Sequence, residues 1–261
     1  MLGLYAKRVV VTGGSSGIGL ATARWLLEAG ARVAICARTE SRLRDVAAGL
    51  GREFGAEHVL AAPVDVLDSA AVNAFAEQVR GTFGGLDALV NNAGQGRQST
   101  FASTDDAAWR DEWALKLFSQ INPARAFEKD LRAARGAVVM VNSLLALQPE
   151  PHMVCTSAAR AGVQSLLKSL SVEWAPDIRV NGIVLGLVGS GQWAKRFAER
   201  ADQSVSHADW YDALARRKGI PLGRLGEPSE AAAAIGFLAS PAASYITGAT
   251  LDVSGGLARH I

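Results

Sequence analysis

The chain has few cysteines and almost no net charge, and both deficits exclude whole classes of protein. Cys36 and Cys155 are its only cysteines among 261 residues. Two dispersed thiols form neither a disulfide scaffold nor a zinc site, so we expect reduced thiols and no metal. The formal net charge of +2 offers no electrostatic basis for binding nucleic acid or a membrane surface. A small-molecule substrate is the partner that these features favour.

The sequence also lacks a targeting signal and a membrane anchor. The opening stretch, MLGLYAKRVVVTGG, has no charged segment followed by an apolar one and a small-residue cleavage site. No apolar run approaches the roughly 20 residues that cross a bilayer. There is no internal repeat, low-complexity tract or linker. We therefore expect one cytoplasmic domain that covers 1–261.

Short apolar runs alternate with longer helical patterns along most of the chain. This alternation predicts an α/β fold in which a parallel sheet has helices on both faces. Seven runs have the length and composition of strands, at 7–12, 31–37, 57–65, 86–92, 136–143, 178–185 and 249–255. Helical periods are expected at 18–27, from 41 onward, and at 69–83, 104–133 and 155–174.

Residues 187–222 break this rhythm. They are polar and helix-prone, with Trp193, Trp210 and Tyr211 interleaved, and they follow a strand's carboxyl end. Open α/β sheets bind ligands at that edge, so we interpret the segment as a lid over a substrate cleft. An insertion without a role is the alternative.

The first strand runs directly into a glycine-rich loop, TGGSSGIG at 12–19. Glycines permit the tight turn and let the backbone approach an anion, while the following helix contributes oriented N–H groups and a partial positive charge. The position between a strand and a helix makes a dinucleotide site the preferred interpretation over a packing turn. The candidate contacts are Gly13, Ser15, Ser16, Gly17, Ile18 and Gly19.

The end of the second strand carries Arg38 rather than an acidic residue. An acidic side chain there would accept hydrogen bonds from a ribose 2′-hydroxyl, whereas a guanidinium suits a 2′-phosphate. Arg38 therefore favours NADP over NAD as cofactor. The alternative is a solvated surface arginine.

Five motifs in order give the chain a resemblance to the short-chain dehydrogenase/reductase family. They are TGGSSGIG, VDV at 64–66, NNAG at 91–94, RVN at 179–181 and the final PLGRLGEPSEAAAAIGFLAS…SYITGATLDVSGG. The resemblance spans about residues 5 to 257. It implies a Rossmann-type doubly wound sheet of seven parallel strands, a nicotinamide cofactor and a homo-oligomer, as tetramer or dimer. It further implies cofactor contacts near adenine, at the fourth strand and at the nicotinamide end, which are Asp65, Val66, Asn91, Ala93, Gly94, Gly186 and Val188.

The same resemblance implies a catalytic set of serine, tyrosine, lysine and asparagine, and here the chain departs from it. Ser143 ends a strand where the family serine is expected. Thr156, Arg160 and Lys116 occupy the positions of the tyrosine, the lysine and the asparagine. A threonine hydroxyl does not titrate, so the usual phenol mechanism is not available.

Other groups in this sequence could take over parts of that chemistry. Arg160 remains cationic and could hold ribose hydroxyls and stabilise an oxyanion. Lys116 is the best candidate proton donor, because a desolvated lysine beside Arg160 has a lowered pKa. The alternative for Lys116 is an exposed helix residue. His152, oriented by Glu150, is a weaker candidate, and Cys155 is interpreted as a small buried side chain.

Two functions follow from this pattern. The favoured hypothesis is an NAD(P)(H)-dependent oxidoreductase that acts on a carbonyl or alcohol with an altered proton donor. The alternative is a protein of the same fold that binds the nicotinamide cofactor without redox chemistry, as a sensor or partner. The glycines of the loop are intact while three catalytic positions have changed to polar residues, which indicates an altered site rather than decay.

Overall fold

The computed structural model describes residues 2–200 and 204–259. In it, seven parallel strands form one sheet in the order β3-β2-β1-β4-β5-β6-β7. This order reverses direction between β1 and β4, which is the switch point of a doubly wound sheet. The strands are β1 (Arg8–Thr12), β2 (Arg32–Ala37), β3 (Val59–Pro63), β4 (Ala88–Asn91), β5 (Ala137–Ser143), β6 (Arg179–Leu185) and β7 (Thr250–Val253).

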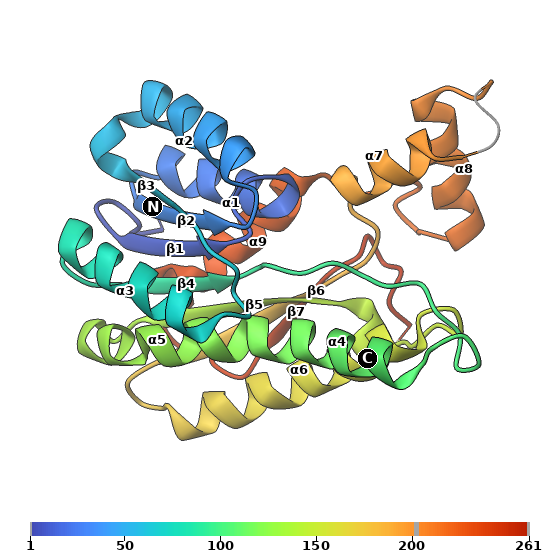
Figure 1. Cartoon of the computed structure of the whole chain (residues 1–261). Coiled ribbons are helices and arrows are strands. Elements are labelled where there is room, and N and C mark those ends of the chain that lie inside the picture. Colours follow the sequence, from blue (N-terminus) through green and yellow to red (C-terminus); the bar gives the residue numbers. More distant parts are fainter. Residues whose placement is uncertain (1, 201–203, 260–261) are drawn as a thin grey trace.

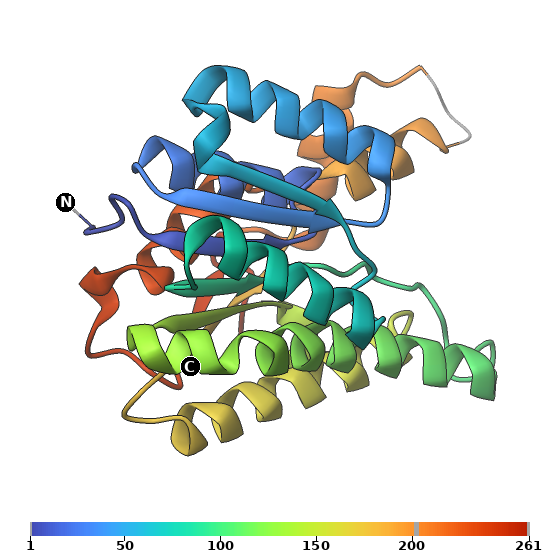
Figure 2. The same cartoon turned by 60° about the vertical axis from the view of Figure 1, so that its left-hand side comes forward.

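Helices cover both faces of the sheet, as the alternating pattern predicts (Figures 1 and 2). One layer contains α1 (Gly17–Glu28), α2 (Glu40–Phe54) and α9 (Pro228–Ala239). The other contains α3 (Ser69–Phe83), α4 (Asp106–Trp113), α5 (Ser119–Ala134) and α6 (Val154–Glu173). The predicted fold class, a Rossmann-type α/β sheet of seven parallel strands, is confirmed.

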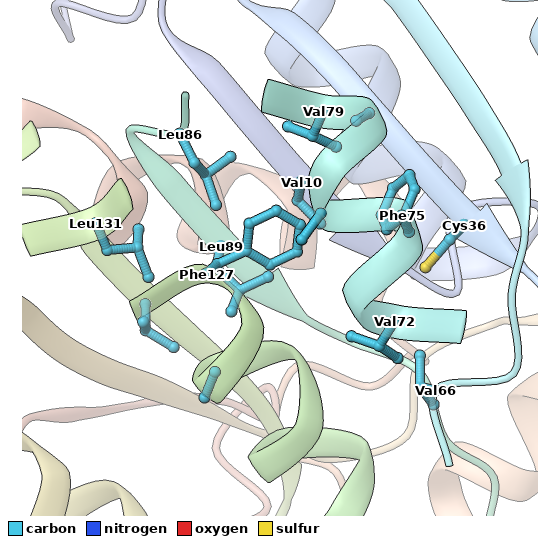
Figure 3. Packing of buried hydrophobic residues seen from close by; sticks show 14 of the residues in the cluster. Val10, Cys36, Val66, Val72, Phe75, Val79, Leu86, Leu89, Phe127 and Leu131 are labelled. Carbon is cyan, nitrogen blue, oxygen red and sulfur yellow. The ribbon is translucent and has the colours of Figure 1, made fainter. Parts of the chain in front are cut away.

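The core consists of two apolar layers separated by the sheet. Successive side chains of a strand point to opposite faces, so Val10 packs with one layer while Val9 and Val11 pack with the other. Figure 3 shows the first layer, where Phe75 of α3 meets Phe127 of α5. Their rings lie edge to face with centroids 6.2 Å apart. This packing fixes the positions at which the strands end, and thereby the edge where the site lies.

Most of the expected boundaries agree with the structure to within one or two residues. Two of the expected elements have an internal structure that the sequence did not predict. The expected helix over 104–133 is three consecutive segments, because a π-helical turn at Ala114–Phe118 joins α4 to α5. Such wide turns are frequent at functional sites, and this one contains Lys116. The expected strand at 57–65 begins only at Val59, after a 3-10 turn at Ala56–His58.

The segment expected to be a lid contains two helices, α7 (Gly191–Ala198) and α8 (His207–Lys218). Figure 1 shows both beyond the carboxyl ends of the strands, to the upper right of the sheet. Trp193, Trp210 and Tyr211 pack against a small apolar cluster that also includes Leu144. Residues 201–203, inside this segment, lie outside the described residues. Within the described chain, no helix has both the length and the apolar character needed to cross a membrane.

Candidate active site

A cavity of about 1180 Å³ lies at the carboxyl edge of the sheet, where the loops after β1, β2, β4, β5 and β6 come together. An open parallel sheet forms its ligand crevice there, because neighbouring crossovers diverge at the switch point. Most of the predicted cofactor contacts line this one cavity. They are Gly13, Ser15, Ser16, Gly17, Ile18, Gly19, Arg38, Asp65, Val66, Ala93, Gly94, Arg160, Gly186 and Val188.

The loop between β1 and α1 has the shape of a dinucleotide cradle. Gly13 and Gly17 have φ angles of +70° and +53°, which favour glycine. A Cβ at Gly13 would lie 3.0 Å from the Cα of Ala93, and one at Gly19 would overlap the carbonyl of Gly13. Among the residues that the structure describes, no side chain caps the N-terminus of α1, so its amide groups are available to a phosphate. These residues fit a nicotinamide dinucleotide.

The adenosine end of the cavity lies at the carboxyl ends of β2 and β3. Arg38, Thr39 and Arg42 line it beside Asp65 and Val66. Asp65 is exposed, and its Oδ1 accepts the amide of Leu67 at 3.0 Å. Two guanidinium groups therefore face the cavity where an acidic side chain would meet a ribose diol.

The two asparagines at the end of β4, Asn91 and Asn92, differ from the expectation. Asn91 does not line the cavity, because its fully buried side chain points toward α5 and donates to the carbonyl of Gln120 at 3.0 Å. Asn92 lines it instead, and its Nδ2 donates to the carbonyl of Thr12 at 2.9 Å. The Thr12 hydroxyl accepts the amides of Asn92 and Ala93, each at 3.0 Å. The correction follows from strand alternation, which sends adjacent side chains to opposite sides.

Ser143 and Arg160 share one wall of the cavity. Ser143 ends β5, and its Oγ accepts the amide of Leu145 at 3.3 Å. Within the described chain no group accepts its hydroxyl proton, which leaves that proton for a ligand. Arg160 donates from Nη1 to the carbonyl of Val141 at 3.1 Å, while its buried Nε has no hydrogen-bond partner in the described part. The Ser143 hydroxyl can therefore donate into the cavity, which the cationic Arg160 also lines.

Lys116 and Thr156 do not line the cavity; they belong to a buried network behind it. Lys116 donates from Nζ to Glu112 Oε1 at 2.7 Å and to the carbonyl of Gln95. Thr156 donates its hydroxyl proton to the same carboxylate oxygen and accepts the amide of Arg97 at 3.1 Å. The backbone of residues 95–97 separates the network from the cavity, because it is held against Lys116 and Thr156.

Burial and charge set the protonation of this network. Burial, together with the neighbouring charge of Arg160, lowers the pKa of Lys116 to about 8, even though Glu112 opposes the shift. Burial also lowers the pKa of Arg160 to about 10, again against Glu112, so Arg160 stays cationic at neutral pH. The sequence predicts this direction for Lys116, and its alternative as an exposed helix residue is wrong, because the side chain is 2% exposed.

Glu112 is the residue that sequence reasoning missed. It is buried, and it bonds to two of the residues that replace the usual catalytic set. The signal was available, because Glu112 and Lys116 stand four residues apart on a helical segment. The weaker candidate His152 precedes α6, is half exposed, pairs with Glu150 at 3.0 Å and does not line the cavity. Cys155 is buried against the Ser99 hydroxyl, as expected of a small core side chain.

A family model and several known enzymes match nearly the whole chain. A family model described as "Enoyl-(Acyl carrier protein) reductase" matches residues 13–258. A 3-oxoacyl-[acyl-carrier-protein] reductase from Chlamydia muridarum is 35% identical over 98% of both chains. A cis-4-hydroxycyclohexanecarboxylate dehydrogenase from Sinomonas cyclohexanicum is 39% identical over 97% of both.

Solved structures agree with this match. A short-chain oxidoreductase from Pseudomonas aeruginosa PAO1 that contains an atypical catalytic center is 57% identical, with a TM-score of 0.96 over 99% of this chain and 100% of that one. An NADPH-bound structure with the same description is also 57% identical, with a TM-score of 0.93 over 98% of this chain and 100% of that one. The chain therefore belongs to the short-chain dehydrogenase/reductase family and is an NAD(P)-dependent oxidoreductase.

Proposed function

We propose that this protein is an NADPH-dependent reductase of a carbonyl substrate, or the corresponding alcohol dehydrogenase, that works without a catalytic phenol. The observation that carries the proposal is a single cavity that joins the dinucleotide cradle to Ser143 and Arg160. The NADPH-bound relative from Pseudomonas aeruginosa and an NADPH-bound L-sorbose reductase from Gluconobacter frateurii, 34% identical over 100% of this chain with a TM-score of 0.94, support it. The non-redox alternative is not favoured by these oxidoreductase relatives.

The cofactor would lie along the glycine loop and supply hydride chemistry when bound. Ser143 then orients the substrate, because its free hydroxyl proton can be donated to a carbonyl oxygen. The fixed charge of Arg160 would stabilise negative charge on that oxygen, and with the cofactor bound its guanidinium would hold hydroxyl groups of the nicotinamide ribose. Neither role requires a proton to leave the guanidinium.

Lys116 is proposed as the proton source. Its pKa of about 8 leaves it mostly protonated at neutral pH and able to release that proton. Glu112 and Thr156 keep the network oriented by the two bonds that they share. Gln95, whose carbonyl accepts from the ammonium, lines the cavity, so Lys116 lies one residue behind the wall. Its proton would reach the substrate oxygen through this wall, by a movement of residues 95–97 or through a bridging water.

The direct test compares NADPH oxidation by the wild type with that by a variant that lacks the Ser143 hydroxyl. We expect the purified protein to oxidise NADPH with members of an aldehyde and ketone panel. Ser143→Ala should lower kcat by about a hundredfold or more, since a positioned donor contributes on that scale. Its affinity for NADPH should stay the same. A panel that gives no turnover above the Ser143→Ala background would contradict the proposal.

The preference for NADP over NAD is proposed from Arg38. In Arg38→Asp, the carboxylate repels a 2′-phosphate and accepts hydrogen bonds from a 2′-hydroxyl. We expect NADPH affinity to fall by about a hundredfold or more and NADH affinity to hold or improve, as measured by fluorescence titration of both nucleotides. Arg217→Asp, at an exposed position of α8 that does not line the cavity, is the control. An unchanged ratio of the two affinities would assign Arg38 to the solvated surface.

The remaining expectations stay part of the proposal. Helix α7 contributes Trp193 and Arg196 to the cavity lining, and Glu199 follows its last residue, which supports the lid interpretation of 187–222. We further propose a small-molecule substrate, a homo-oligomer that is a tetramer or a dimer, and a cytoplasmic location.

A further inference from the structure

Five arginines line the cavity, against two carboxylates, Asp65 and Glu199. Three of the arginines have tasks in the proposed function. Arg38 and Arg42 face the adenosine end, and Arg160 lies beside Ser143. Arg97 and Arg196 have no role in the proposed function. Arg97 lines the cavity from the loop after β4, and Arg196 lines it from α7.

Arg97 belongs to the loop after β4. Its backbone is anchored at the start of α6, because its amide donates to the Thr156 hydroxyl at 3.1 Å. Two residues later, Ser99 donates its amide to the carbonyl of His152 at 2.9 Å. The main chain is thus fixed while the side chain lines the cavity and is exposed. Among the residues that the structure describes, no carboxylate or carbonyl accepts from the Arg97 guanidinium.

Arg196 approaches from α7. Its guanidinium carbon lies 4.6 Å from the ring centroid of Trp193, in a stacked cation–π contact. Trp193 lines the same cavity and packs against the cluster that contains Leu144, the residue after Ser143. Within the described ranges no acidic side chain pairs with Arg196. This contact holds the guanidinium over the ring and leaves its N–H groups available to a planar anion.

Four other basic residues of this region, among those whose side chains the structure describes, either have partners or lie outside the cavity. Lys218 pairs with Glu150 at 2.9 Å, and Arg200 donates to the carbonyls of Phe197 and Val205. Arg216 and Arg217 are exposed and do not line the cavity. Among the arginines that line the cavity, Arg97 and Arg196 are therefore the two without a role in the proposed function, and the apolar Leu115, Val188 and Trp193 line the same cavity.

We propose that the substrate is an oxo acid, or the matching hydroxy acid, whose carboxylate is bound by Arg97 and Arg196 while its apolar part lies against Trp193 and Val188. This inference rests on the proposed function, because it places the reacting carbonyl at Ser143. A carboxylate suits the site, since a guanidinium presents two parallel N–H donors to its two oxygens.

The test compares acids with their neutral esters on the protein saturated with NADP⁺. The probes are phenylglyoxylate and levulinate, each beside its methyl ester, and binding is measured by calorimetry. We expect the acids to bind about tenfold or more tightly than the esters in the wild type. In the double variant Arg97→Gln/Arg196→Gln the preference should disappear while NADPH affinity is kept. Arg216→Gln/Arg217→Gln, with the same loss of charge outside the cavity, should behave as wild type.

Three results would overturn the inference. They are equal binding of acid and ester, no binding of either acid, and an acid preference that survives in the double variant. A loss of NADPH affinity in that variant would assign the two arginines to the cofactor and also overturn it. Failure of the proposed function looks different, since NADPH oxidation would then be absent for acids and esters alike whatever their binding.

Discussion

Replacing Arg160 with methionine is expected to remove most turnover while the fold stays about as stable. The guanidinium is buried with an unbonded Nε, so the folded protein bears a desolvation penalty that its partners offset only in part. Methionine fills a similar volume without charge. We expect the free energy of unfolding to change by about 1–2 kcal/mol or less in chemical denaturation. Turnover should fall by about a hundredfold or more, because the fixed charge beside the reacting oxygen is gone.

Arg160→Lys separates charge from shape in the same position. An ammonium restores the charge but not the planar guanidinium, whose Nη1 donates to the carbonyl of Val141 and to Asn142 Oδ1. Partial recovery of kcat in the lysine variant would support an electrostatic role. If Arg160→Met and the wild type have the same kcat, Arg160 only packs in the core, and its proposed role in stabilising the oxyanion is wrong.

The strands and the glycine loop could be predicted from the sequence because their signals are local. The run KRVVVT at 7–12 is apolar and short, and it leads straight into glycines, so the strand, the turn and the helix N-terminus each follow from adjacent residues. The structure places β1 at Arg8–Thr12 and α1 from Gly17.

The wall between cavity and network could not be predicted in this way. Residues 95–97 carry no periodic pattern, and they lie over Lys116 and Thr156 only because the main chain bonds to both side chains. Spacing alone placed Thr156 and Lys116 at catalytic positions, which is correct for the elements but does not decide which side chains reach a cavity. Asn91 illustrates the same limit, since a shift of one residue along a strand exchanges a buried side chain for a lining one.

Glu112 was missed because its partners are tertiary. A glutamate on a helix is most often a solvated residue, and only the packing of α4 against α6 brings its carboxylate to Thr156. Once it is buried, it is the counter-charge that allows Lys116 and Arg160 to remain close together inside the protein. The three altered positions thus act as one unit around a carboxylate.

Replacing Lys116 with methionine is expected to lower the rate of reduction by about a hundredfold or more and to remove its alkaline limb. In the wild type the ammonium form of Lys116 is depleted as pH rises through about 8, so kcat for reduction should fall across that pH. Lys129→Met, the same substitution at an exposed position of α5, is the control. The measurement is kcat against pH at saturating NADPH and substrate for the three proteins.

Replacing the two charged neighbours of Lys116 should shift the alkaline limb, the fall of kcat with rising pH, in opposite directions. Arg160 lowers the pKa of Lys116 and Glu112 raises it, so Arg160→Met should move the limb to higher pH and Glu112→Gln to lower pH. The pH at which kcat falls is located from the residual turnover of each variant. A limb at the same pH in all of them would exclude Lys116 as the titrating donor.

The titration of Lys116 should also make the unfolding free energy depend on pH, in a direction that its pKa shift determines. The pKa of Lys116 is about 8 in the folded protein and has its ordinary value of 10.5 when the chain unfolds, so the unfolded chain binds the extra proton between those values. The unfolding free energy should therefore rise with pH from about 8 to 10.5 in the wild type relative to Lys116→Met, as followed by denaturant titration. A difference that falls over this range, or none at all, would mean that burial does not penalise the ammonium, and Lys116 would then have no reason to give up its proton near neutral pH.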